Sequence, residues 1–167
     1  YYTKKGDYYE GQFQDNVPCG KGYKKWKAGS EYKGEFSNGQ ENGYGKKKWI
    51  DGQIYEGYFV NGTKQGKGTQ IFIDGQRYEG DFKDGKYNGK GIYSWPNCMK
   101  YIGEFKDNKI EGKGLWIWPN GDKYEGDFIN GKCAGYGIEV NFDGKRYEGQ
   151  FKEDEYNGKG VSYYPNG

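Results

Sequence analysis

Residues 78–100, YEGDFKDGKYNGKGIYSWPNCMK, decide the fold, because each feature of this stretch recurs along the chain. A Tyr is followed two positions later by Gly and four positions later by Phe, and then by Asp-Gly, G-x-G and a large aromatic residue. Equivalent tyrosines are spaced by 23 residues at Tyr9, Tyr32, Tyr55, Tyr78, Tyr101, Tyr124 and Tyr147. Self-similarity at a fixed period indicates a repeat architecture.

Two further series share this spacing. The phenylalanines are Phe13, Phe36, Phe59, Phe82, Phe105, Phe128 and Phe151. The late aromatic residues are Trp26, Trp49, Phe72, Trp95, Trp118 and Tyr164. The sixth copy has Asn141 at that position, with Phe142 beside it.

Turn signals occur at two fixed places in each copy. One follows the Phe, as in Asp107-Asn108, and the other precedes the next Tyr, as in Asn120-Gly121. Gly, Asn and Asp tolerate the positive φ that tight hairpin turns need. Two turns per copy predict two strands per copy, joined as a meander. We therefore expect an all-β fold, an elongated and twisted single-sheet solenoid of tandem antiparallel hairpins.

The odd repeat length constrains the register. Side chains alternate between the faces of a strand, so each copy needs one odd step if every Tyr is to share a face. A two-residue turn after the Phe and a three-residue loop at Pro119–Gly121 would supply it and would place Tyr, Phe, Gly and Trp on one face. Each ring would then lie opposite a glycine on the partner strand. A bulge in the second strand is the alternative, which would move the Trp to the other face.

The pattern Y-E-G-x-F, D/N-G, G-x-G resembles the MORN (membrane occupation and recognition nexus) repeat over essentially the whole chain. Departures are Cys98 for the Gly before Tyr101, Ile102 for the usual Glu, and Asn141. The resemblance implies a binding or scaffold module. Similar arrays occur in axonemal radial-spoke heads, in junctophilins and in protozoan cytoskeletal scaffolds, and some hold a partner helix or peptide in an aromatic groove.

The repeats divide the chain into a trailing strand of a preceding repeat, residues 1–8, and seven repeats over residues 9–167. Tyr1 is not an initiator Met, and Gly167 falls just before a repeat would begin. We therefore expect a segment of a longer chain.

The sequence gives no support for a catalytic function. It has no His, the commonest general base, and its carboxylates recur once per copy rather than forming a unique pair. No G-x-x-x-x-G-K-[ST] phosphate loop is present. The thiols Cys19, Cys98 and Cys133 lack zinc-site spacing. We expect no catalytic residues, no metal, no cofactor and a reducing, cytoplasmic compartment.

The charge distribution indicates which kinds of partner the chain could bind. The net charge is +2, from 26 basic and 24 acidic residues, which gives little support to nucleic-acid binding. A lysine row between the G-x-G glycines at Lys21, Lys67, Lys90, Lys113 and Lys159 leaves anionic lipid as an alternative, with membrane targeting of an attached enzyme. Nearby acidic residues weaken that alternative.

A one-sided aromatic sheet exposes apolar area of the kind that marks interaction sites. We expect protein partners, bound as a helix or an extended peptide at Tyr93, Trp116 and the late aromatic series Trp26, Trp49, Phe72, Trp95, Trp118 and Tyr164. The tyrosines and phenylalanines spaced by 23 residues are expected to be structural. The sheet ends could support self-association. The resemblance implies a cytoskeletal location, with the cilium or axoneme as its setting.

Overall fold

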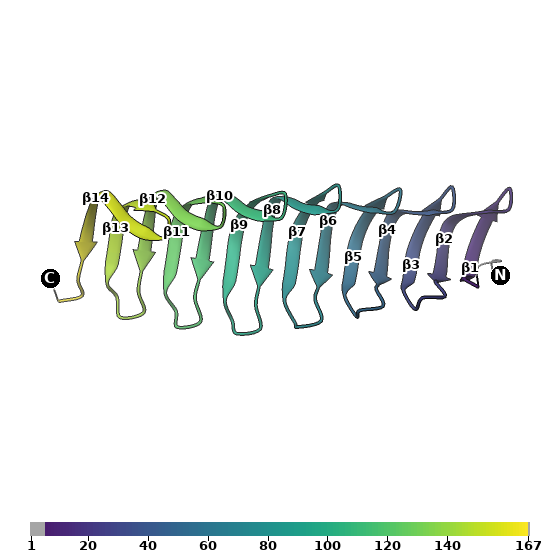
Figure 1. Cartoon of the computed structure of the whole chain (residues 1–167), viewed down its shortest axis with the longest axis horizontal. Helices are drawn as coiled ribbons and strands as arrows, with labels where there is room; N and C mark the ends of the chain where they lie inside the picture. Colours follow the sequence, from purple (N-terminus) through teal and green to yellow (C-terminus); the bar gives the residue numbers. More distant parts are fainter. Residues whose placement is uncertain (1–5, 167) are drawn as a thin grey trace. The chain divides into compact units, whose positions relative to one another are not determined.

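The computed structural model describes residues 6–166, and the regular elements within that range are all β-strands. They form one sheet whose strand order follows the sequence from β1 to β14 (Figure 1). The all-β, single-sheet fold of tandem hairpins is therefore confirmed. Residues 1–5 of the expected trailing strand lie outside the described residues, and β1 begins at Tyr8.

The chain divides into two compact units, one ending at Lys86 and the other beginning at Tyr87. The strands that begin in the first unit are β1 (Tyr8–Gln14), β2 (Val17–Lys25), β3 (Glu31–Ser37), β4 (Gln40–Lys48), β5 (Ile54–Val60), β6 (Thr63–Ile71), β7 (Arg77–Lys83) and β8 (Lys86–Ser94). Those of the second unit are β9 (Lys100–Lys106), β10 (Lys109–Ile117), β11 (Lys123–Ile129), β12 (Lys132–Val140), β13 (Arg146–Lys152) and β14 (Glu155–Tyr163), together with β8 from Tyr87 onward. Paired strands within each unit are antiparallel.

The turn after each Phe has two residues, as the sequence predicts. Lys106 pairs with Lys109 across Asp107 and Asn108. Both turn residues have positive φ, of 49° and 69°. These values fit the tight hairpin turn whose twist matches that of the flanking strands.

The loop before each Tyr has three residues, which is also confirmed. The Trp118 N–H donates to the Asp122 carbonyl at 2.9 Å, and the Gly121 N–H donates to the Trp118 carbonyl at 3.0 Å. Gly121 has φ of +95°, which favours glycine at this position. This loop provides the odd step that the repeat length requires.

A bulge in the second strand accompanies that loop rather than replacing it. Ile110 pairs with Phe105 and Gly114 pairs with Gly103, so three residues of β10 lie opposite one residue of β9. The bulge adds two residues, an even number, and leaves the facing of side chains unchanged. Trp116 consequently pairs with Tyr124 on the Tyr face.

The glycines pair with one another, which corrects the expected ring-opposite-glycine register. Gly114 lies opposite both Gly103 and Gly126, whereas Tyr101 lies opposite Trp116. The Tyr101 ring leans along its own strand and covers the glycine pair. A Cβ added at Gly114 would lie only 2.5 Å from the Tyr101 Cε2 atom. The glycines therefore make room for a neighbouring ring.

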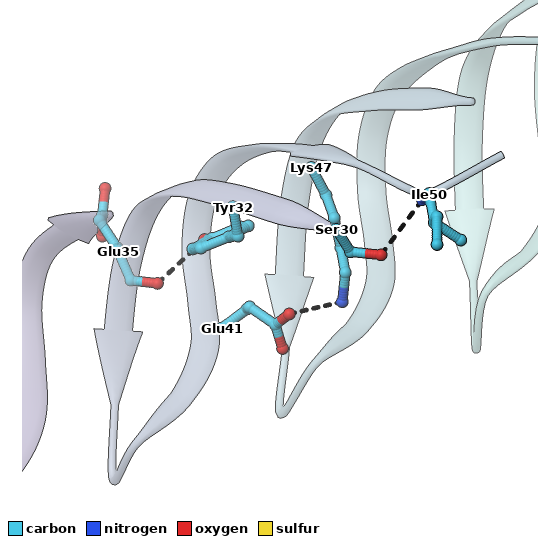
Figure 2. Close-up of polar contacts among 6 residues, drawn as sticks. All are labelled: Ser30, Tyr32, Glu35, Glu41, Lys47 and Ile50. Carbon is cyan, nitrogen blue, oxygen red and sulfur yellow. Dashed lines mark hydrogen bonds and ion pairs between the residues drawn. The ribbon is translucent and has the colours of Figure 1, made fainter. Parts of the chain in front are cut away.

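Alternating Tyr and Phe rings form the core. Tyr32 meets Phe36 at 5.1 Å and Phe59 at 5.2 Å between ring centroids, both edge to face. The Tyr32 hydroxyl donates to the Glu35 carbonyl at 2.9 Å (Figure 2). Burial raises the pKa of Tyr32 well above its usual value, so the hydroxyl stays protonated as a donor. Within each unit, every Phe after the first thus contacts the Tyr of its own copy and of the preceding copy.

Burial follows this ladder. Fully buried or nearly so are Tyr9, Tyr32, Tyr55, Tyr78, Tyr101, Tyr124, Tyr147, Phe36, Phe59, Phe82, Phe105, Phe128 and Phe151. Phe13 differs, with 45% of its surface exposed. It lies on β1, and among the residues that the structure describes no strand precedes β1 to cover it.

Hydrogen bonds join each copy to the next along the row of three-residue loops, which we call the loop edge, and along the row of two-residue turns, which we call the turn edge. The Ile50 N–H donates to Ser30 Oγ at 3.2 Å on the loop edge (Figure 2). On the turn edge, the Gly62 N–H donates to the Glu41 carbonyl at 2.8 Å. Register is thus fixed at the turns and loops as well as within the strands.

Candidate functional site

The sheet presents two chemically different faces. We call the face with the Tyr, Phe and Trp rows the ring face, and the opposite one the polar face. The register places on the polar face the acidic residues Glu10, Glu35, Glu56, Glu79, Asp81, Glu104, Glu125, Asp127 and Glu148.

In the second unit the ring face carries a continuous run of large rings, Tyr93, Trp95, Trp116 and Trp118, which we call the aromatic strip. Tyr93 contacts Trp95 at 4.5 Å between centroids, and Trp95 stacks on Trp116 at 5.5 Å. Trp118 follows at 6.0 Å from Trp116. All four side chains are half-buried, so the strip combines packing against the sheet with surface open to a partner.

A pocket of about 390 Å³ lies beside the strip. Its apolar lining is Tyr87, Tyr93, Trp95, Phe105, Ile110 and Trp116. Asn108, Lys109 and Asn130 also line it and supply polar groups. Ligand pockets commonly combine apolar walls with a few polar groups that fix orientation.

The Trp116 indole N–H is buried and has no hydrogen-bond acceptor among residues 6–166. A buried donor without an acceptor carries a desolvation cost. Trp116 is thus both the central ring of the strip and a donor in need of an acceptor.

In the first unit the ring face combines aromatic rings with lysines. Trp26, Trp49 and Phe72 are half-buried there. Lys24 Nζ lies 4.8 Å from the centroid of the Trp26 ring. Lys47 Nζ lies 4.8 Å from Trp26 and 5.6 Å from Trp49. These distances are those of cation–π contacts.

Lys64 completes what we call the lysine cluster, Lys24, Lys47 and Lys64. Its Nζ lies 5.3 Å from the Phe82 ring and 5.6 Å from the Tyr55 ring, and it donates to Gln70 Oε1 at 2.6 Å. Burial lowers the pKa of Lys64 to about 8, because desolvation disfavours the charged ammonium.

Lys47 has an acidic partner. Its Nζ lies 2.5 Å from Glu41 Oε1 (Figure 2), and the two side chains are only 17% and 11% exposed. Lys24 and Lys64 have no carboxylate within ion-pair distance among the residues that the structure describes.

On the polar face the lysine row between the G-x-G glycines is partly neutralised. Lys67 pairs with Asp81 and Lys113 with Asp127, both at 2.8 Å. A hollow of about 800 Å³ lies on this face of the first unit, over Gly11, Gly22 and Gly34 and beside Tyr23 and Tyr44. We did not expect this hollow from the sequence.

Two further surface features were not predicted from the sequence. The lysine cluster has a sequence signal, since Lys24 and Lys47 stand two residues before a Trp and must share its face. The other feature is an aliphatic row in which Ile102 pairs with Ile92 and Leu115 on the polar face.

The remaining expected partner-binding residue is Tyr164, which is 59% exposed. Lys145 Nζ lies 5.5 Å from its ring. In the sixth copy Asn141 keeps the loop geometry of Trp118, since its N–H donates to the Lys145 carbonyl at 2.8 Å. The adjacent Phe142 is 75% exposed in the loop rather than part of the strip.

Among residues 6–166 there is no group of three or more His, Cys, Asp or Glu placed to hold a metal ion. In the same range no helix is long and apolar enough to cross a membrane. The three cysteines are free thiols, and burial raises the pKa of Cys133 to about 12.

Solved structures that match this chain include one of similar fold. The TCP domain of SAS-4 (dCPAP) from Drosophila melanogaster, in complex with a proline-rich motif of Ana2 (dSTIL), is 15% identical with a TM-score of 0.57. The alignment covers 89% of this chain and 80% of that chain. The wild-type TCP10 domain of Danio rerio CPAP, in complex with a peptide of Danio rerio STIL, is 17% identical over 96% of this chain and 90% of that chain, with a TM-score of 0.29.

Comparison with curated proteins gives no significant match. The family model of the MORN repeat matches residues 9–31, 32–54, 55–77, 78–97, 101–123, 124–146 and 147–167. These matches begin at the seven tyrosines of the 23-residue series. The chain therefore belongs to the MORN repeat family.

Proposed function

We propose that this chain is a non-catalytic scaffold that holds a segment of a partner protein, a helix or an extended peptide, along its ring face. The observation that carries the proposal is the aromatic strip beside its pocket. Trp and Tyr are the residue types most enriched at binding hot spots. Half-buried, stacked rings also lose little conformational freedom when a partner binds.

The chemistry of the pocket suits a peptide with apolar or proline side chains. Proline-rich segments dock in grooves lined by aromatic rings because their extended helix is already formed. The protein of similar fold from Drosophila melanogaster is in complex with a proline-rich motif, which is consistent with this preference.

We place this scaffold in a cytoplasmic, cytoskeletal assembly, with the cilium or axoneme as its setting. The support is the family resemblance. End-to-end association of arrays is a further element of the proposal, supported by β14, whose residues are all exposed at the edge of the sheet.

Selection from a phage-displayed library of random peptides tests the proposal. The wild-type chain should enrich a consistent peptide motif. Trp95→Ala combined with Trp118→Ala should lose that enrichment, because it removes two rings of the strip. Tyr136→Ala is the matched control, since Tyr136 is 55% exposed and lies on the polar face of the same unit.

Circular dichroism should show that both variants keep the β-sheet. Failure of the wild-type chain to enrich any peptide would sink the proposal. So would equal enrichment by the Trp variant.

A further inference from the structure

We infer that the lysine cluster is a receptor for carboxylate side chains, so that the segment bound over the first unit is acidic. The inference rests on the proposed function, and it names a chemical class of partner for one part of the ring face.

The ammonium groups of the cluster are held in place by the rings beneath them. Lys24 and Lys47 stand at equivalent positions of successive copies, one on each side of Tyr32 in the strand register. Both lie over the Trp26 ring. Lys64 is fixed by Gln70, whose own amide donates to Gln53 Oε1 at 3.0 Å. Each charge therefore has a defined position before a partner arrives.

The cluster has unused hydrogen-bonding capacity. An ammonium group has three donors; Lys64 uses one of them on Gln70 and Lys47 uses one on Glu41, which leaves two on each. A half-buried ammonium near ring faces gains more from an anion than one in bulk water, because the surrounding dielectric is lower. Charge-assisted hydrogen bonds to carboxylates are also stronger than bonds to neutral acceptors.

Limited exposure favours a peptide side chain over a membrane as the occupant. The Lys47 side chain is only 17% exposed. A flat lipid surface meets projecting groups, and the more exposed lysines of this unit lie on the polar face, such as Lys67 at 70%. An Asp or Glu side chain can extend down between the rings to reach the cluster.

The lysine cluster has no counterpart at the equivalent positions of the second unit. Those equivalent to Lys24 and Lys47 are Tyr93, Trp116, Glu139 and Ser162, and those equivalent to Lys64 are Tyr87, Ile110, Cys133 and Tyr156. None of these residues is basic, and Tyr87, Tyr93, Ile110 and Trp116 line the pocket described above. The two units thus present different recognition chemistry on the same face of the repeat.

Peptide display on the intact chain tests the inference. Peptides selected by the wild-type chain should be enriched in Asp and Glu. The variant Lys24→Gln/Lys47→Gln/Lys64→Gln should still select peptides, through the aromatic strip, but without the acidic enrichment. The control Lys21→Gln/Lys46→Gln/Lys67→Gln removes the same charge from the polar face and should behave as wild type.

Fluorescence anisotropy with a selected acidic peptide then measures affinity. Lys64→Gln should weaken binding about tenfold, the scale of one charge-assisted hydrogen bond. Replacing the acidic residues of the peptide with Gln should lower affinity for the wild-type chain by at least that factor and should add nothing on the Lys24→Gln/Lys47→Gln/Lys64→Gln variant. If Lys64→Gln is misfolded by circular dichroism, Lys64→Met serves, because it keeps the apolar stem.

The outcomes separate the two proposals. Selection of peptides without acidic enrichment would overturn this inference and leave the scaffold proposal standing, whereas no selection at all would overturn both. Co-sedimentation with vesicles of phosphatidylserine and phosphatidylcholine gives the other source of anions. Vesicle binding that is lost in the lysine-cluster variant and kept in the polar-face control would reassign the cluster to lipid and overturn the inference.

Discussion

Cys98 occupies a backbone conformation that its neighbours in the repeat series leave to glycine. Its φ is +69°, and the equivalent loop residue Gly121 has φ of +95°. A side chain in this left-handed region costs about 1–2 kcal/mol. Its N–H still donates to the Trp95 carbonyl at 3.2 Å, so the turn is kept despite the cost.

We therefore expect Cys98→Gly to stabilise the chain by about 1 kcal/mol, because it relieves the strain at φ +69°. Urea unfolding followed by circular dichroism measures the change. Cys98→Ser keeps a Cβ and should leave the midpoint where it is. Equal stability of the glycine variant and the wild type would show that the loop is not strained.

Lys64 should make stability depend on pH. Its pKa is about 8 in the folded chain, below the usual 10.5. Between these values the unfolded chain binds the proton and the folded chain does not, so the free energy of unfolding rises with pH. The rise begins near pH 8, and below that value the buried ammonium lowers stability by a constant amount.

Urea unfolding at a series of pH values from about 7 to about 9.5 measures this effect against the Lys64→Gln variant. Wild-type stability should rise relative to that variant through this range. Tyr55, which faces Lys64, stays neutral because burial raises its pKa. Lys67→Gln, on the polar face of the same strand, should keep the rise. A constant difference between wild type and Lys64→Gln would contradict the assignment.

At the scale of the strand, the close fit of Tyr over glycine is the main packing device. A Cβ at Gly114 would lie 2.4 Å from the Tyr101 hydroxyl oxygen and 2.5 Å from Cε2, closer than real contacts allow. Tyr101 cannot move away without losing its edge-to-face contacts with Phe105 and Phe128. The element therefore tolerates no side chain at this position.

Gly114→Ala should accordingly destabilise the chain by about 3 kcal/mol, the upper end of the cost of overpacking. Thermal and urea unfolding measure the loss. Lys113→Ala, one residue away on the polar face, removes only an exposed ion pair and should change stability by less than about 0.5 kcal/mol. Similar losses in the two variants would contradict the role given to Gly114.

Most of this fold could be predicted because the same 23-residue pattern occurs seven times in the sequence. The turn lengths followed from residue types that accept positive φ. The alternation of side chains along a strand then placed Trp118 on the same face as Tyr101. The glycine register could not be predicted in the same way. Gly103 pairs with Gly114 because the bulge at Gly112 shifts β10 relative to β9. The bulge adds two residues, so it does not change which face each side chain occupies, and side-chain alternation in the sequence gives no sign of it. The position of a residue in its strand also does not show in which direction its ring leans.

At the scale of the whole chain, the repeated positions build the sheet and the variable positions define its surface. Both units share the Tyr and Phe ladder, yet their ring faces differ in the residues opposite each Tyr. Lys47 lies there in one unit and Trp116 in the other. The sequence could place these residues on a face, but it could not show the stacking of Trp95 on Trp116 or the pocket beside them. Those depend on side-chain rotamers and on contacts between copies.

The most direct test of the central claim is fluorine NMR of the chain labelled with fluorotryptophan, titrated with a peptide obtained by display selection. The five tryptophans give separate probes of the ring face, and single Trp→Phe variants assign them. The account predicts saturable shifts at Trp95, Trp116 and Trp118 as the peptide binds. Binding detected by anisotropy with no change at any of these three signals would contradict it.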